Sequence, residues 1–164
     1  MSSILKVDQI QLSNGNTPTI GDLGLNTTGS VLNVRNLITT SYLTTTSTTP
    51  VQAGINLSIT PTSSSSKVLV NIFINGVNRS TGEPRLALYR NGTFLTDLGS
   101  SVGQHASTNE SGGRSYSYED SPNTTSTATY QIWFSTSSGI IRINDYSNSS
   151  TRERSGITLM EIAG

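Results

Sequence analysis

Short apolar runs with a two-residue period recur from residue 51 onward, and they constrain the fold more than any other feature of the chain. Ile55, Leu57 and Ile59 alternate with polar residues, as expected for a half-buried strand. Turn signals separate the runs, and Asn91-Gly92 is the strongest two-residue hairpin signal among them. No window of helical length carries apolar residues at three- and four-residue spacing. About eight short strands therefore predict an all-β fold, an antiparallel β-sandwich of jelly-roll-like type.

The run KVLVNIFINGV, residues 67–77, is expected at the middle of a sheet because both of its faces carry apolar residues. Leu69 and Phe73 share one face, and the opposite face contributes to the core. The residues that we expect to be buried in the sandwich are Val68, Val70, Ile72, Ile132, Phe134, Ile141, Ile143 and Leu159.

The composition excludes several function classes. The 164 residues include 27 serines and 24 threonines, and only 12% are charged, against roughly 25% in an average protein. The net charge of zero argues against a nucleic acid held mainly through its phosphates. Cysteine is absent, and the single histidine, His105, excludes a multi-histidine metal site within one chain. We therefore expect no catalytic residues, no cofactor and no bound metal, while a calcium site built mainly from backbone carbonyls stays open.

Nothing in the sequence predicts a membrane segment. No apolar run approaches the ~20 residues that span a bilayer, and the N-terminal residues carry charges where a signal peptide would be apolar. A polar surface rich in Ser and Thr suits an extracellular or virion-exposed β protein better than a cytoplasmic enzyme.

Residues 1 to about 30 differ from the rest of the chain. They hold regularly placed apolar residues, among them Ile4, Leu5, Val7, Ile10 and Leu12, but too few to build a core. Such a segment needs a partner surface. Residues 31–44 follow as a connecting strand or linker, and residues 45–164 form the predicted sandwich domain.

The sequence gives little support to two classes of enzyme. A serine hydrolase would depend on His105 as its base, yet no G-x-S-x-G turn occurs. A glycan hydrolase needs two carboxyl groups ~5 to 9.5 Å apart. Glu119 and Asp120 are adjacent and would point to opposite faces of a strand, whereas Glu110 and Asp145 could meet only through tertiary contacts. We therefore predict a protein that is not an enzyme.

A polar, glycine-rich stretch from Gln104 to Arg114 is predicted to be a loop, and a short strand is predicted after it. Tyr116 and Tyr118 share one face of this strand, where packing in the protein is favoured over stacking on a sugar. The late arginines are expected to pair with carboxylates rather than to form an anion-binding patch. The candidate surface-contact residues are His105, Asn109, Arg114, Tyr116 and Tyr118.

Four stretches together resemble a known class of proteins. They are the opening MSSILKVDQI, the passage ITPTSSSSKVLV from Ile59 to Val70, the run YEDSPNTTSTATYQIWF from Tyr118 to Phe134, and the ending SGITLMEIAG. Their order and spacing resemble small tail-fibre or fibre-type virion proteins of tailed bacteriophages, especially of marine and cyanobacterial phages.

The resemblance implies a non-enzymatic virion structural protein, a short homotrimeric fibre located at the tail or the capsid exterior. Residues 1 to about 30 would be an arm that docks on other virion proteins, and the distal domain would face the host. A host cell-surface glycan is one partner compatible with this role. The alternatives are a capsid decoration, cement or head-fibre protein and, further away, a small polysaccharide-degrading enzyme.

Overall fold

The computed structural model describes residue 15 and residues 28–99, 112–145 and 151–164, and these residues contain strands but no helix. The strands are β1 (Val31–Thr39), β2 (Leu43–Thr45), β3 (Val51–Ile59), β4 (Lys67–Arg79), β5 (Pro84–Arg90), β6 (Thr93–Asp97), β7 (Gly112–Asp120), β8 (Ala128–Thr136), β9 (Ile141–Ile143) and β10 (Ser155–Ile162). The predicted all-β class is confirmed.

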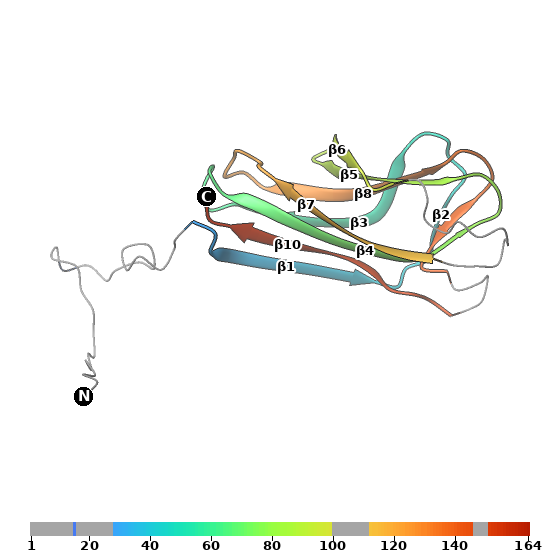
Figure 1. Ribbon diagram of the computed structural model, residues 1–164, viewed down its shortest axis with the longest axis horizontal. Helices are drawn as coiled ribbons and strands as arrows, with labels where there is room; N and C mark the ends of the chain where they lie inside the picture. Colours follow the sequence, from blue (N-terminus) through green and yellow to red (C-terminus); the bar gives the residue numbers. More distant parts are fainter. Residues whose placement is uncertain (1–14, 16–27, 100–111, 146–150) are drawn as a thin grey trace, which may run out of the picture.

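Two antiparallel sheets pack face to face (Figure 1). In the first sheet, β4 is paired with β7 on one side and with β10 and β9 on the other, and β1 and β2 pair outside β10 and β9. β1 with β2, and β9 with β10, are thus two long strands that are each interrupted once. The second sheet has the order β3-β8-β5-β6.

The connectivity is that of a jelly roll. When the interrupted strands are counted once, each sheet has four strands, and every connection crosses between the sheets except the β5–β6 hairpin. In that hairpin both turn residues, Asn91 (φ 49°) and Gly92 (φ 79°), have positive φ, the conformation for which Asn-Gly is selected.

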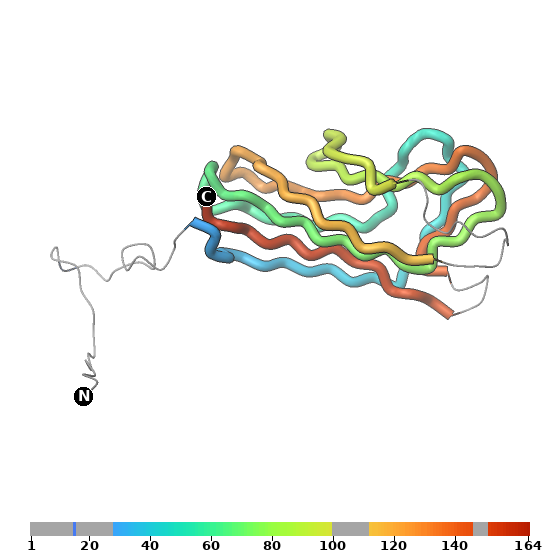
Figure 2. The backbone as a smooth tube through the Cα atoms, viewed as in Figure 1, coloured from blue at the N-terminus to red at the C-terminus, as the bar shows by residue number. Residues whose placement is uncertain are grey.

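The segment expected to connect the arm to the domain is paired throughout most of its length. β1 forms an edge of the first sheet against β10, and β2 pairs with β9 from Leu43 to Thr45. Gly29 donates its backbone N–H to Ala163 O at 2.8 Å, so the chain enters the sheet beside its C-terminus, as Figure 2 shows.

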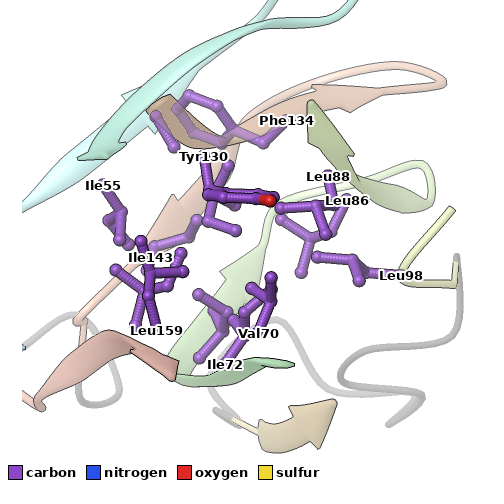
Figure 3. Close-up of a cluster of buried hydrophobic side chains, with 14 of the residues drawn as sticks. Ile55, Val70, Ile72, Leu86, Leu88, Leu98, Tyr130, Phe134, Ile143 and Leu159 are labelled. Carbon is purple, nitrogen blue, oxygen red and sulfur yellow. The ribbon is translucent and has the colours of Figure 1, made fainter. Parts of the chain in front are cut away.

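The core lies between the sheets. All eight residues predicted to be buried are at most 3% exposed, and Ile72 and Leu159 from the first sheet meet Tyr130, Leu86 and Leu88 from the second (Figure 3). β4 is central, as predicted, but its outward residues Leu69 and Phe73 are only partly buried. The outer face of the first sheet is therefore less covered than the apolar pattern of this strand indicates.

Candidate ligand-binding groove on the second sheet

Three aromatic side chains gather on the outer face of the second sheet. The rings of Tyr89 on β5 and Trp133 on β8 are stacked, with centroids 4.3 Å apart and planes at 18°. Phe94 on β6 meets Tyr89 edge-on at 5.6 Å and is 50% exposed. A cluster of aromatic rings outside the core is a common element of sites that bind small molecules.

The local sequence accounts for this placement. The Asn91-Gly92 turn sets β6 against β5 so that Phe94 lies opposite Tyr89. Trp133 lies opposite Ala87, whose methyl group leaves space beside the indole. A larger residue at position 87 would fill the space into which the groove opens.

A groove of about 180 Å³ runs beside Trp133. Its walls come from the segment before β3 and from the strands β5, β6 and β8. The residues along it are Thr48, Pro50, Arg85, Leu86, Ala87, Asp97, Trp133 and Ser135. An adjoining hollow of about 350 Å³ shares Arg85, Leu86 and Asp97 and also includes Gly99. The larger hollow falls within the range of roughly 300–1,000 Å³ that is usual for small-molecule sites.

Polar groups without partners line the groove. The indole N–H of Trp133 is buried and donates no hydrogen bond within the part of the chain that the structure describes. Arg85 and Asp97 are exposed, and neither forms an ion pair with another described residue. A buried N–H without an acceptor is costly, so an acceptor supplied from outside would stabilise this site.

This combination suits a sugar. Trp133, the member of the aromatic cluster that lines the groove, offers apolar surface to the C–H groups of a pyranose ring, and Arg85 and Asp97 offer several donors and acceptors for neighbouring hydroxyls. Metal chemistry finds no support in residues 28–99, 112–145 and 151–164, because no three His, Cys, Asp or Glu side chains gather there as a metal site would require. No helix among the described residues is long and apolar enough to cross a membrane.

Other charged clusters hold the fold together. Arg90 Nη1 and the Tyr130 hydroxyl each donate to Asp120 Oδ2 at 2.6 Å, which ties β5, β8 and β7 together. Burial raises the pKa of Tyr130, and the hydrogen bond to Asp120 raises it further. Burial alone would lower the pKa of Arg90, but the hydrogen bond and the charge of Asp120 outweigh it and raise that pKa. Both shifts favour a charged Arg90 and a neutral Tyr130, the forms that donate to Asp120.

Asp145 is 2% exposed and lies where β9 gives way to β10. Its carboxylate is 3.4 Å from Arg152 Nη1 and 3.9 Å from Arg142 Nε. The Arg152 guanidinium lies over the Tyr42 ring, 4.7 Å from its centroid. For Arg90, Arg142 and Arg152, the prediction that late arginines pair with carboxylates is confirmed.

Glu161 is fully buried near the C-terminal end of β10. Its Oε1 accepts hydrogen bonds from the Thr62 backbone at 2.6 Å, the Thr62 hydroxyl at 2.7 Å and the Ser66 hydroxyl at 2.8 Å. Burial by itself would raise the pKa of Glu161, but these hydrogen bonds and one from the Ser63 backbone hold it below its ordinary value. The charged carboxylate thus fastens the turn before β4 to β10.

The predicted site residues divide into two groups. Ile4, Leu5, Val7, Ile10, Leu12, His105 and Asn109, together with the carboxylate candidate Glu110, lie outside the described residues. Arg114, Tyr116 and Tyr118 lie on β7, so the loop predicted to reach Arg114 gives way to strand already at Gly112.

Tyr116 and Tyr118 are partly buried and pack against the core, as the packing interpretation expected. Burial raises the pKa of Tyr116, although the nearby charge of Arg114 acts against this. The prediction that Glu119 and Asp120 point to opposite faces of a strand is confirmed. Glu119 points outward and pairs with Lys67, and Asp120 points inward and pairs with Arg90.

Sequence reasoning missed the aromatic cluster. Trp133 is the sole tryptophan of the chain and lies in an alternating run, so the sequence could have marked it as facing away from Ile132 and Phe134. The meeting of Tyr89, Phe94 and Trp133 depends on the pairing of three strands, which periodicity does not reveal.

Comparisons with known proteins show distant likeness in fold. No protein-family model matches the sequence, and no curated protein does either. One solved structure, of T=1 particles derived from infectious bursal virus, aligns with 8% identity and a TM-score of 0.40 over 80% of this chain and 36% of the other. A structure of the Gx strain of infectious bursal disease virus aligns with 11% identity and a TM-score of 0.35 over 82% and 39%. This chain therefore spans less than two fifths of the length of either viral chain.

Proposed function

We propose that this chain is a non-enzymatic virion structural protein of fibre type, which binds a glycan on the host surface through the groove on its second sheet. Residues 1 to about 30 form the arm that docks on other virion proteins, and three copies assemble into a short fibre. The groove beside Trp133, which is lined by the indole ring and by the unpaired charged residues Arg85 and Asp97, is the observation that supports glycan binding most directly.

The carboxylates support a binding role rather than hydrolysis. Asp97 is the only carboxylate among the described residues that line the two hollows, whereas glycan hydrolysis uses a facing pair. The buried carboxylates of Asp120, Asp145 and Glu161 are each held by partners from the protein itself.

The arm and the virion location rest on the resemblance described above. A segment with apolar residues but no core of its own needs a surface to dock on, and the described lining of the groove belongs to the sandwich. An arm and a head with separate tasks fit a small fibre.

Glycan binding is tested with the full chain on an array of bacterial surface oligosaccharides, followed by titration of the best binder. We expect wild type to bind at least one structure and Trp133→Ala to weaken that binding at least tenfold. Tyr42→Ala is the matched control, because Tyr42 is an exposed aromatic residue that lines neither hollow. Absence of binding by wild type, or equal affinity of wild type and Trp133→Ala, would contradict the proposal.

The same titration separates binding from hydrolysis. The bound oligosaccharide should be recovered intact after prolonged incubation. Shortened products that disappear with Asp97→Asn would replace the binding role by an enzymatic one.

Anchoring is tested by removing residues 1–27, which leaves the first described backbone hydrogen bond of Gly29 in place. The truncated protein should fold and bind glycan but fail to incorporate into particles. Normal incorporation would rule out the arm as the docking element.

A further inference from the structure

The outer face of the first sheet lacks a covering layer. We define the first-sheet face by the residues that β1, β10, β4 and β7 turn away from the core: Val34, Asn36, Ile38, Thr158, Met160, Ile162, Lys67, Leu69, Asn71, Phe73, Ser115, Ser117 and Glu119. Register pairs place these side chains on one face, since directly opposed residues of antiparallel strands point the same way.

Apolar side chains cross this face in two rows. One row runs from Val34 through Met160 to Leu69, and the other from Ile38 past Gly156 to Phe73. Val34 and Ile38 are 55% and 53% exposed. Large apolar side chains exposed in neighbouring rows are typical of a surface that another protein covers.

Gly156 keeps the second row continuous. A Cβ at this position would lie 2.8 Å from two ring atoms of Phe73, so the ring lies directly over the glycine. Phe73 thereby reaches across β10 toward Ile38 on the edge strand. The row would be interrupted by any side chain at position 156.

The first-sheet face carries one charged pair and no net charge. Glu119 lies opposite Leu69 and Lys67 lies opposite Ile162, at one corner of the face, where Lys67 Nζ and Glu119 Oε1 are paired with each other at 2.6 Å. Between the apolar rows lies a row of uncharged polar residues, in which Asn36 donates to Thr158 at 3.3 Å and Ser117 donates to Asn71. Amides and hydroxyls both donate and accept, so such a row can form hydrogen bonds with polar groups of another copy.

We infer that the first-sheet face is the surface through which copies of this chain assemble. A strongly acidic or basic partner would find no net charge to pair with, whereas the face of a second copy matches it in apolar and uncharged polar groups. The face also combines exposed side chains with a hollow: Val34 and Ile38 lie on the edge strand β1, and a hollow of about 250 Å³ lies beside Phe73, over β4, β7 and β10. In the inferred assembly, the exposed side chains of one copy enter the hollow of the next, a head-to-tail contact that can close into a ring of three.

The size of the face is compatible with this role. Four strands spaced ~4.8 Å apart and about eight residues long cover on the order of 500 Å² in projection. Side-chain relief makes the accessible area larger, and stable interfaces bury about 800 Å² per partner.

This inference rests on the assembly stated in the proposed function but not on glycan binding, because the groove lies on the opposite sheet. The test is the mass of the full chain in solution, measured by light scattering across a concentration series. Wild type should have three times the monomer mass of 17.4 kDa, and the double substitution Val34→Ser with Ile38→Ser should reduce the mass to that of one chain.

Phe94→Ser is the matched control, because Phe94 has a similar exposure of 50% on the other sheet. It should leave the mass unchanged. Circular dichroism and thermal unfolding establish that the double variant keeps its fold, which is expected because both side chains point to solvent.

The outcomes separate the inference from the proposal. If wild type is a monomer at all concentrations, both the proposed assembly and its inferred surface are overturned. The same result is expected if residues 1–27 cover the face of their own chain. A trimer that the double substitution leaves intact would overturn the first-sheet face as its interface while keeping the proposed assembly. Loss of mass in the control as well would show that the second sheet takes part, and would likewise overturn the inference.

Discussion

The two outer faces of the sandwich differ although they cover one core. The first-sheet face presents aliphatic side chains, one phenylalanine and uncharged polar groups, and the charged pair at its corner is satisfied internally. The outer face of the second sheet presents an aromatic cluster, a groove and two charged residues, Arg85 and Asp97, that form no ion pair with described residues.

This difference is informative because charge is scarce in the chain. With 12% charged residues, most polar positions are serine, threonine or asparagine. Buried carboxylates such as Asp120 and Glu161 are held by hydrogen bonds within the protein. The exposed and unpaired Arg85 and Asp97 beside an aromatic groove therefore favour the second sheet as the proposed ligand face and the first sheet as the proposed assembly face.

The largest expected effect concerns the core that both faces share. Ile72→Ala should lower the free energy of unfolding by about 2–5 kcal/mol, because it leaves a cavity among fully packed residues. Its neighbour Asn71 points outward on the same strand, and Asn71→Ala should change stability by less than about 0.5 kcal/mol. Urea denaturation measures both changes in the free energy of unfolding, at a protein concentration where the two variants have the same oligomeric state. Equal losses would show that β4 does not separate an inner face from an outer one.

The next effect sharpens the assignment of the ligand face. Arg85→Met and Asp97→Asn should each weaken glycan binding about tenfold, since a hydrogen bond to a charged group contributes about 1.5–3 kcal/mol. Neither change should alter the mass in solution. Binding is measured by calorimetry and mass by light scattering. If these variants change the mass in solution but bind the glycan with unchanged affinity, the second sheet would be the assembly face rather than the ligand face.

A smaller effect concerns acid. Hydrogen bonds lower the pKa of Glu161 in the folded protein, so this group stabilises the fold fully above its unfolded pKa of about 4.3 and loses that contribution as the pH falls through the lower folded value. Stability should therefore decline below about pH 4.3, and the decline should be shallower in Glu161→Gln. Thermal unfolding between pH 6 and pH 3 tests this. Parallel curves for the two proteins would show that Glu161 does not contribute.

The smallest effect is expected at the corner of the first-sheet face. Lys67 and Glu119 are paired at 2.6 Å, but their side chains are 47% and 57% exposed. Lys67→Met should change stability by less than about 1 kcal/mol. Assembly should also persist in 1 M salt, because the face contributes no other charge. Dissociation by salt, followed by light scattering, would show that charge holds the copies together.

Much of the fold was predictable from local pattern. Alternation in β3, β4 and β8 predicted which side chains are buried, and Asn91-Gly92 predicted the hairpin, because both signals depend on neighbours in the chain. The interruptions between β1 and β2 and between β9 and β10 were not predictable, since they depend on how long strands bend over the core.

The candidate site was harder to predict from the local sequence pattern. Tyr116 and Tyr118 were conspicuous as a pair on one strand, yet they pack against the core. Trp133, Tyr89 and Phe94 lie on three strands, and their contact depends on the register of β5 with β8 and β6. Long-range register follows from the packing of both sheets together.

The sequence by itself determined the all-β class, the inward face of each main strand and the lack of cysteine and histidine clusters, because these follow from composition and a two-residue period. Tertiary structure decided the jelly-roll order of the strands and the ion pairs of Asp120 and Asp145. It also placed Arg85 and Asp97 along one groove and left Val34 and Ile38 exposed on the edge strand β1. The physical reason is that the pleat of a strand is local, whereas the neighbours of a strand are selected by the burial of two whole sheets.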